Sequence, residues 1–275
     1  MNWPIGQVHL NVADLKRSVD FYQRVIGLVV QDERDSTVTM GAQDGVALLN
    51  LMERSQGERS RGGTGLYHFA ILLPSRLDLA RVLKHFADTV TPLQGLSDHY
   101  VSEAIYLADP EGNGIEIYRD RPRSDWQFPD GKLNMGTVYM DVDGVMGELD
   151  GNDPTFTGLP EGTIMGHVHL HVYNIPAAEH FYRDLLGMEV MVHYGGAASF
   201  VSWEGYHHHL GLNTWKPGAP SAITPNTLGL RWYEVDLGTN RATTIERLQA
   251  AGLALENQDE GVLVRDPVGN GVLFV

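Results

Sequence analysis

The sequence contains no cysteine, and this absence excludes several chemistries at once. Without thiols the chain can have no disulfides, no thiolate zinc sites and no cysteine nucleophile. It also lacks any run of 18 or more apolar residues, so we expect no transmembrane helix. The first ten residues, MNWPIGQVHL, show no basic segment followed by an apolar stretch, so no secretory signal is visible. These features together predict a cytoplasmic protein.

Basic residues are scarce. The chain has 20 Lys and Arg against 35 Asp and Glu, which gives a formal net charge of −15. Such a surface repels phosphate backbones and anionic lipid, so nucleic acids and membranes are poor candidates for partners. The hydrophobic content is an ordinary 43% over 275 residues, enough for two cores of normal size. The composition therefore predicts a globular protein, and it leaves room for a homo-oligomer.

Two segments of the chain recur at nearly the same spacing. Residues 6–30 match residues 166–190 at an offset of 160, and the match includes His9 and the pair Phe21–Tyr22. Residues 109–118 match residues 266–275 at an offset of 157. Two separate matches at almost one offset indicate a duplicated domain.

Each half of the chain contains two copies of a smaller pattern. Residues 8–12 alternate as a strand, and a helix follows for which Asp14 is a suitable N-cap and Gly27 a suitable end. Three strand-like segments come next, and the same order restarts near residues 66, 166 and 228. The predicted fold class is α+β, with four βαβββ modules in two tandem domains.

The segment between the two halves loses this periodicity. It is rich in Gly, Pro and Asp, so we expect a connector with a short strand near TVYMDV, residues 137–142. The predicted domains are residues 1–120, which would hold the metal site described next, and residues 164–275. Residues 121–163 would join them.

Three candidate metal ligands occupy comparable places in the first half. His9 and His68 lie in the first strands of the two modules, and Glu116 lies between Ile115 and Ile117 in the last strand of the second module. Alternation places His9 and Glu116 opposite the apolar side chains, hence on the uncovered face of the sheet. Two imidazoles and one carboxylate are the ligands of the facial triad that binds iron(II) and leaves positions open.

Isolated polar residues on an exposed sheet face are the plain alternative, and for His9 alone this interpretation is favoured. Three ligand-type residues at repeat-equivalent positions weaken it. Glu116 weakens it most, because a carboxylate facing inward between two isoleucines must be paired or bound to a metal. The sequence thus predicts a divalent-metal site made by His9, His68 and Glu116.

The four modules, the FY…GL end of the helix and the strand DPEGNGIEIY resemble the vicinal oxygen chelate superfamily of glyoxalases, bleomycin-resistance proteins and extradiol dioxygenases. The resemblance covers nearly the whole chain outside the connector. It implies that two modules form one open, barrel-like sheet with helices outside. It also implies metal ligands from the first strands of both modules and the last strand of the second, where His9, His68 and Glu116 fall. Residues 98–122 and 207–215 are most similar to bacterial catechol-2,3-dioxygenase-like proteins.

Tyr106 and His99 are the candidate catalytic residues that this resemblance implies. Tyr106 precedes Glu116 by ten residues, the spacing of the tyrosine next to the metal ligands in extradiol enzymes. A phenol there can hydrogen-bond the metal-bound oxygen of a catecholate. His99 resembles the loop histidine that contacts substrate. An ordinary strand aromatic and a solvated loop histidine are the structural alternatives.

The second half departs from the family pattern. His169 matches His9, but Trp232 stands where His68 does and Leu273 replaces Glu116. Better-known two-domain extradiol enzymes keep their metal in the C-terminal half and carry a catalytic base histidine on the strand that corresponds to 207–209. This half is still rich in histidine, with His167, His169, His171, His207, His208 and His209. A polar cavity or interface is the favoured role of these histidines, and a weaker second metal site with Glu234 is the alternative.

The predicted function is a non-haem iron(II) extradiol-type dioxygenase that cleaves a catecholic aromatic ring with O2, with manganese, zinc or nickel as alternative metals. Two other functions stay open. A glyoxalase-like lyase or isomerase would use zinc, nickel or manganese with a fourth carboxylate ligand, where the sequence has Asn50 with Glu53 nearby. A non-catalytic small-molecule-binding protein, as among the bleomycin-sequestering relatives, would leave the three predicted ligands unexplained.

Overall fold

The computed structural model describes residues 3–59, 62–216, 218 and 223–275. It separates into two compact units, and each unit gathers segments that are distant in the chain. The first unit holds Met1–Ala13, Met52–Tyr67 and His167–Val275. The second holds Asp14–Leu51 and His68–Gly166. Among the described helices, none is long and apolar enough to cross a membrane.

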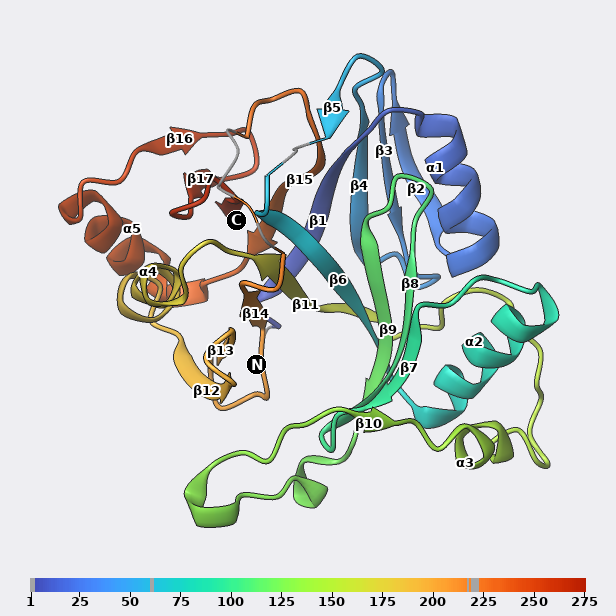
Figure 1. Ribbon diagram of the computed structural model, residues 1–275. Helices are drawn as coiled ribbons and strands as arrows, with labels where there is room; N and C mark the ends of the chain where they lie inside the picture. The colour runs from blue at the N-terminus through green and yellow to red at the C-terminus, as the bar shows by residue number, and fades with distance from the viewer. Residues whose placement is uncertain (1–2, 60–61, 217, 219–222) are drawn as a thin grey trace. The chain divides into compact units, whose positions relative to one another are not determined.

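The predicted α+β class with four βαβββ modules is confirmed, and Figure 1 labels the elements. The first module is β1 (Ile5–Val12), α1 (Leu15–Phe21), η1 (Tyr22–Ile26), β2 (Val29–Arg34), β3 (Thr37–Gly41) and β4 (Ala47–Glu53). The second is β6 (Gly65–Leu73), α2 (Arg76–Asp88), β7 (Gly95–Asp98), β8 (Ser102–Ala108) and β9 (Gly114–Asp120).

The second half repeats this order. The third module is β11 (Ile164–His171), α4 (Ile175–Glu179), η4 (His180–Leu185), β12 (Glu189–Tyr194), β13 (Ala198–Ser202) and β14 (Leu210–Asn213). The fourth is β15 (Thr227–Val235), η5 (Gly238–Asn240), α5 (Arg241–Ala250), β16 (Leu255–Asn257), β17 (Val262–Arg265) and β18 (Gly271–Phe274).

Short elements lie between the modules: β5 (Glu58–Arg59), η2 (Arg123–Asp125), η3 (Pro129–Gly131), β10 (Val138–Tyr139) and α3 (Val142–Gly147). β10 falls in the segment 137–142 where the sequence predicts a short strand. The division into residues 1–120, 121–163 and 164–275 follows the modules and stays a prediction.

In the second unit, five strands are ordered β10-β7-β8-β9-β6, and β2 pairs with β3. β9 runs parallel to β6 and antiparallel to β8. Helix α1 contacts β3 and helix α2 contacts β9 within this unit (Figure 1). In the first unit, five strands are ordered β16-β17-β18-β15-β1, and β11, β14, β13 and β12 form a second run.

The helix that follows β1 begins and ends where the sequence predicts. The Asp14 carboxylate accepts the Arg17 backbone N–H at 2.9 Å, which makes it an N-cap. Gly27 ends the helical segment in the left-handed region with φ of 86°. A β-carbon at this position would lie 2.6 Å from the Phe156 ring and 2.8 Å from the Cα atom of Gly158, so only glycine fits.

A turn built the same way precedes the last strand of the second and the fourth modules. Asp109 accepts the Tyr22 hydroxyl at 2.8 Å and both the backbone and side-chain N–H of Asn113, each at 2.8 Å. Asp266 accepts the Tyr182 hydroxyl and the corresponding N–H groups of Asn270. Burial raises the pKa of both tyrosines, so each phenol stays a donor. This turn fixes the start of β9, which carries Glu116.

Candidate metal centre

Strand register places three predicted site residues on one face of the second unit's sheet. The parallel pair β6–β9 aligns His68 with Gly114 and Ala70 with Glu116. The antiparallel pair β8–β9 aligns Tyr106 with Glu116. Side chains two residues apart in a strand share a face, so His68, Glu116 and Tyr106 project to the same side.

Small side chains leave room on this face. Ala70 and Ala104 are fully buried beside Tyr118, and Tyr106 and Leu72 pack against them. The short side chains of these two alanines leave space above the sheet beside His68 and Glu116. The face is therefore apolar around a small group of polar side chains, a typical composition for a ligand site.

His68 and Glu116 form a buried pair. The Nε2 atom of His68 lies 3.0 Å from Oε2 of Glu116, and their side chains are only 7% and 3% exposed. A carboxylate at this depth is costly unless a cation or a metal compensates its charge. His68 and Glu116 are therefore direct neighbours, and their assignment as metal ligands stays a prediction.

His167 is a further buried histidine of the ligand type. It directly follows Gly166, the last residue of β11 that belongs to the second unit. With His68 and Glu116 it makes up a set of two imidazoles and one carboxylate, the donor types of a metal-binding triad.

His9 has a different partner. It lies in the first unit, where its Nε2 atom is 2.8 Å from Oε1 of Glu234. Glu234 also accepts the backbone N–H of Gln7 at 3.1 Å. The assignment of His9 as a ligand of the same metal as His68 and Glu116 stays a prediction. The internal repeat aligns His9 with His169, and no sequence signal distinguishes His167, which lies on the same strand face two residues earlier.

Tyr106 and His99 form a hydrogen-bonded chain beside His68. The Nδ1 atom of His99 lies 2.8 Å from the carbonyl oxygen of Gly136, which can only accept, so Nδ1 carries a proton. In the neutral ring Nε2 is then an acceptor, and the Tyr106 hydroxyl donates to it at 2.7 Å. The ring centres of Tyr106 and His68 are 5.7 Å apart. The predicted catalytic pair therefore lies next to a predicted ligand.

Two further histidines surround His167 within the first unit. The ring of His208 is 4.1 Å from that of His167 between centres, and the Nδ1 atoms of His207 and His208 are 2.7 Å apart. At that distance one ring donates its proton to the other. These buried side chains explain part of the histidine-rich segment 207–209, and they supply a group that can exchange a proton close to His167.

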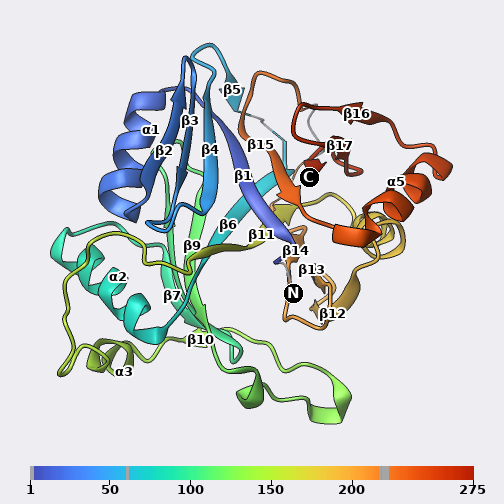
Figure 2. The same cartoon turned by 180° about the vertical axis from the view of Figure 1, so that it is seen from behind.

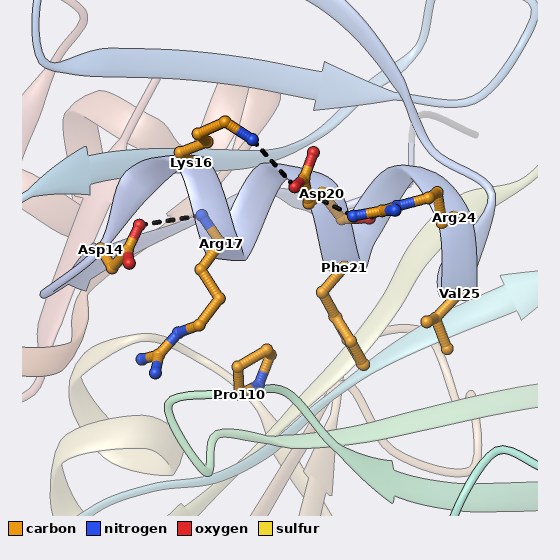
Figure 3. Close-up of a pocket in the computed structure, with 8 residues that line it drawn as sticks. All are labelled: Asp14, Lys16, Arg17, Asp20, Phe21, Arg24, Val25 and Pro110. Carbon is orange, nitrogen blue, oxygen red and sulfur yellow. Dashed lines mark hydrogen bonds and ion pairs between the residues drawn. The ribbon is translucent and has the colours of Figure 1, made fainter.

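A surface pocket of the second unit lies along α1 (Figure 3). Its volume is about 530 Å³, and Lys16 and Arg24 both pair with Asp20 there, at 3.1 and 2.9 Å. These ion pairs are solvent-exposed and share one carboxylate. None of the predicted site residues lines this pocket.

Comparison with known proteins shows which family the chain belongs to. Residues 4–117 match the family described as Glyoxalase/Bleomycin resistance protein/Dioxygenase superfamily. Over 279 residues the chain is 40% identical to the catechol-2,3-dioxygenase of Bacillus subtilis (strain 168), covering 98% of this chain and 96% of that protein. The chain belongs to this superfamily. The resemblance drawn from its sequence motifs is thereby confirmed.

Two more known proteins share part of the sequence or the fold. A lactoylglutathione lyase of Neisseria meningitidis is 24% identical over 124 residues, which cover 42% of this chain and 90% of that protein. Glyoxalase I from Zea mays superposes with a TM-score of 0.58 at 14% identity, covering 99% of this chain and 92% of the maize chain. At that identity the maize structure shows the fold alone, which runs through the whole chain.

Proposed function

We propose that the protein is an extradiol-type dioxygenase that uses iron(II) to cleave a catecholic aromatic ring with O2. The observation that carries this proposal is the buried His68–Glu116 pair, 3.0 Å apart, with the Tyr106–His99 chain beside it. The full-length similarity to a catechol-2,3-dioxygenase supports the same chemistry.

The residues present fit a divalent metal. His68, Glu116 and His167 would hold it, and the set with His9 in place of His167 is the sequence-based alternative. Three protein ligands of this kind leave positions open, and the bound iron would act there as a Lewis acid for the two catechol oxygens and as the site of O2 binding. Manganese, zinc and nickel accept the same donors, so the choice of iron rests on the proposed reaction.

Tyr106 and His99 would position the ring and move its proton. A catechol hydroxyl that reaches the Tyr106 oxygen can transfer a proton there while Tyr106 passes its own to Nε2 of His99. The Gly136 carbonyl holds the His99 ring through Nδ1–H, so Nε2 stays directed at the phenol. His208, whose ring adjoins that of His167, is a second candidate for the group that exchanges protons with substrate.

The lactoylglutathione lyase relative keeps a glyoxalase-like activity as the second candidate. That chemistry would use a further carboxylate ligand from β4. Asn50 stands there, and its side-chain amide donates to the Thr39 hydroxyl at 3.0 Å. An amide engaged with a neighbouring strand is a poorer ligand than a carboxylate, which favours the dioxygenase.

The test is oxygen uptake by protein loaded with iron(II) without air and then given catechol. We expect one O2 consumed per ring and a yellow ring-opened product. Glu116→Gln should abolish both, because the remaining neutral imidazoles hold iron weakly and do not offset its charge. Glu111→Gln is the matched control, a carboxylate that pairs with Arg17 at 2.7 Å instead.

An iron-loaded wild-type protein that ignores every catechol and isomerises a glutathione hemithioacetal would contradict the dioxygenase proposal and favour the lyase. If neither reaction occurs and an aromatic ligand still binds, the chain is a binding protein.

A further inference from the structure

The antiparallel pair β1–β15 in the first unit contains a bulge at Arg231. His9 pairs with Trp232 and Leu10 pairs with Leu230, so Arg231 is an extra residue that has no paired residue on β1. Figure 2 shows the two strands side by side. A bulge redirects a side chain that strict alternation would send to the other face. The guanidinium carbon of Arg231 lies 3.6 Å from the centre of the Trp232 ring.

Arg231 is a partly buried cation with no direct anionic partner among the described residues. Its guanidinium makes no hydrogen bond or ion pair there and stacks on Trp232. Burial, and next the charge of nearby Arg54, lower the pKa of Arg231 to about 10, and the charge of Glu260 opposes this shift only in part. Arg54 itself donates to two backbone carbonyls.

Two buried polar atoms next to Arg231 also have no hydrogen-bond partner among the described residues. One is the Nε1–H of Trp232, a residue that is 5% exposed. The other is Nδ1 of His9, whose ring is 5.3 Å from that of Trp232; because Nε2–H faces the Glu234 carboxylate, Nδ1 of the neutral ring is an acceptor. Buried polar atoms normally find partners, and a cluster left without them is explained most simply by a bound molecule.

Apolar side chains adjoin the Trp232 indole. Trp232 packs with Leu263 and Leu273, and the half-buried Val275 lies against them. Leu273 occupies the position that Glu116 has in the second module. The same part of the module that carries a metal ligand in one copy is therefore apolar in the other.

We propose that this part of the first unit is a second, metal-independent site for a small organic carboxylate with an apolar body. Arg231 and the Trp232 indole N–H bind its oxygens, and Trp232, Leu263 and Leu273 contact its apolar part. A guanidinium and an adjacent N–H suit the planar, two-oxygen geometry of a carboxylate. The site shares no residue with the proposed His68–Glu116–His167 centre, so it stands whether or not the protein is a dioxygenase.

The probe is benzoate, titrated calorimetrically into metal-free protein kept in EDTA, with benzyl alcohol as the uncharged analogue. Benzoate should bind and benzyl alcohol should bind at least about 10-fold more weakly, as loss of a charged hydrogen-bonding group implies. Arg231→Leu and Trp232→Phe should each weaken benzoate by about 10-fold. Arg34→Leu, which removes an exposed arginine paired with Asp32, should have no effect.

A second readout identifies the site directly. Of the five tryptophan indole N–H signals in a ¹⁵N spectrum, the one missing in Trp232→Phe should shift with benzoate. Benzoate binding unchanged in Arg231→Leu would overturn the proposal. Loss of binding in Glu116→Gln instead of Arg231→Leu would overturn it too, because the carboxylate would then occupy the other centre. Equal binding of inorganic phosphate and benzoate would reject the organic carboxylate as the ligand.

Discussion

Glu116 is the residue whose role the sequence predicts most directly. Its neighbours Ile115 and Ile117 are fully buried on the opposite face of β9, and Glu116 itself is 2% exposed. A charged residue between two isoleucines in a strand already implied a buried carboxylate with a partner, and His68 is that partner. The sequence predicts His9 as the third ligand, whereas β11 offers His167 as a further candidate, and local sequence does not rank the two.

The first prediction separates the two candidate third ligands. His167→Ala should weaken iron(II) binding at least about 100-fold, because it removes a direct ligand, whereas loss of an outer contact costs 10- to 100-fold. His9→Ala should leave the affinity unchanged, since His9 bonds Glu234. Anaerobic titration with a competing chelator measures both. The opposite result would restore the ligand set His9, His68 and Glu116.

The second prediction concerns Tyr106. Tyr106→Phe should keep iron binding intact and slow turnover by roughly 10- to 100-fold, since it removes a hydroxyl that acts beside the metal ligands. Tyr139→Phe is the control, because Tyr139 is 97% exposed. Steady-state oxygen uptake gives the rates. Loss of iron from Tyr106→Phe would show that the phenol holds the ligands in place instead.

The third prediction is a pH dependence of stability due to Glu103. This carboxylate is fully buried, and although burial raises its pKa, hydrogen bonds and charge from Arg76 and Arg119 lower it below the ordinary value of 4.5. A lowered folded-state pKa gives stability that is present above pH 4.5 and lost as the pH falls towards the folded-state value.

Glu103→Gln should therefore destabilise the protein at neutral pH, by about 3 kcal/mol, because three arginines, Arg76, Arg119 and Arg121, lose a buried partner. It should also flatten the fall in stability below pH 4.5. Urea unfolding at a series of pH values measures both effects, with Asp20→Asn as an exposed control. A variant with the same acid sensitivity as the wild type would show that other carboxylates cause it.

At the scale of elements, helix starts and ends were predictable and the form of the helix was not. Asp14 and Gly27 carry local signals that do not depend on the rest of the fold. The segment between them changes from α1 to the π-helical turn η1, and α4 changes to η4 in the same way. A π turn inserts one residue without altering the apolar pattern, so sequence periodicity does not reveal it. In both copies the turn carries the tyrosine that binds Asp109 or Asp266.

The fourth prediction tests the end of the first helical segment. Gly27→Ala should lower the free energy of unfolding by more than 2 kcal/mol, the upper cost of a left-handed alanine, because its β-carbon also meets Phe156 and Gly158. Gly45→Ala is the matched control: its φ is 88°, and nothing lies within 4 Å of the added carbon. Urea unfolding compares the two. Equal losses would mean that the backbone angle alone matters.

At the scale of the whole molecule, four modules and their order followed from the repeat, but the pairing of their strands did not. β1 of the first module pairs with β15 of the fourth, so Ile5 lies opposite Val235. All four modules offer similar apolar strands, and no local signal shows which ones will pair. The order of modules in the sequence groups His9 with His68, whereas this pairing gives His9 a partner on β15. The second module thus carries candidate metal ligands, His68 and Glu116. At the equivalent positions of the fourth module Trp232 and Leu273 pack together.

The most direct measurement is anomalous X-ray diffraction at the iron edge from crystals of protein loaded with iron(II) without air. We predict one strong peak per chain, within about 2.0–2.3 Å of a His68 nitrogen and a Glu116 oxygen, as for other imidazole and carboxylate ligands. A peak at the His9–Glu234 pair, with none near Glu116, would contradict the proposed metal centre and the function built on it.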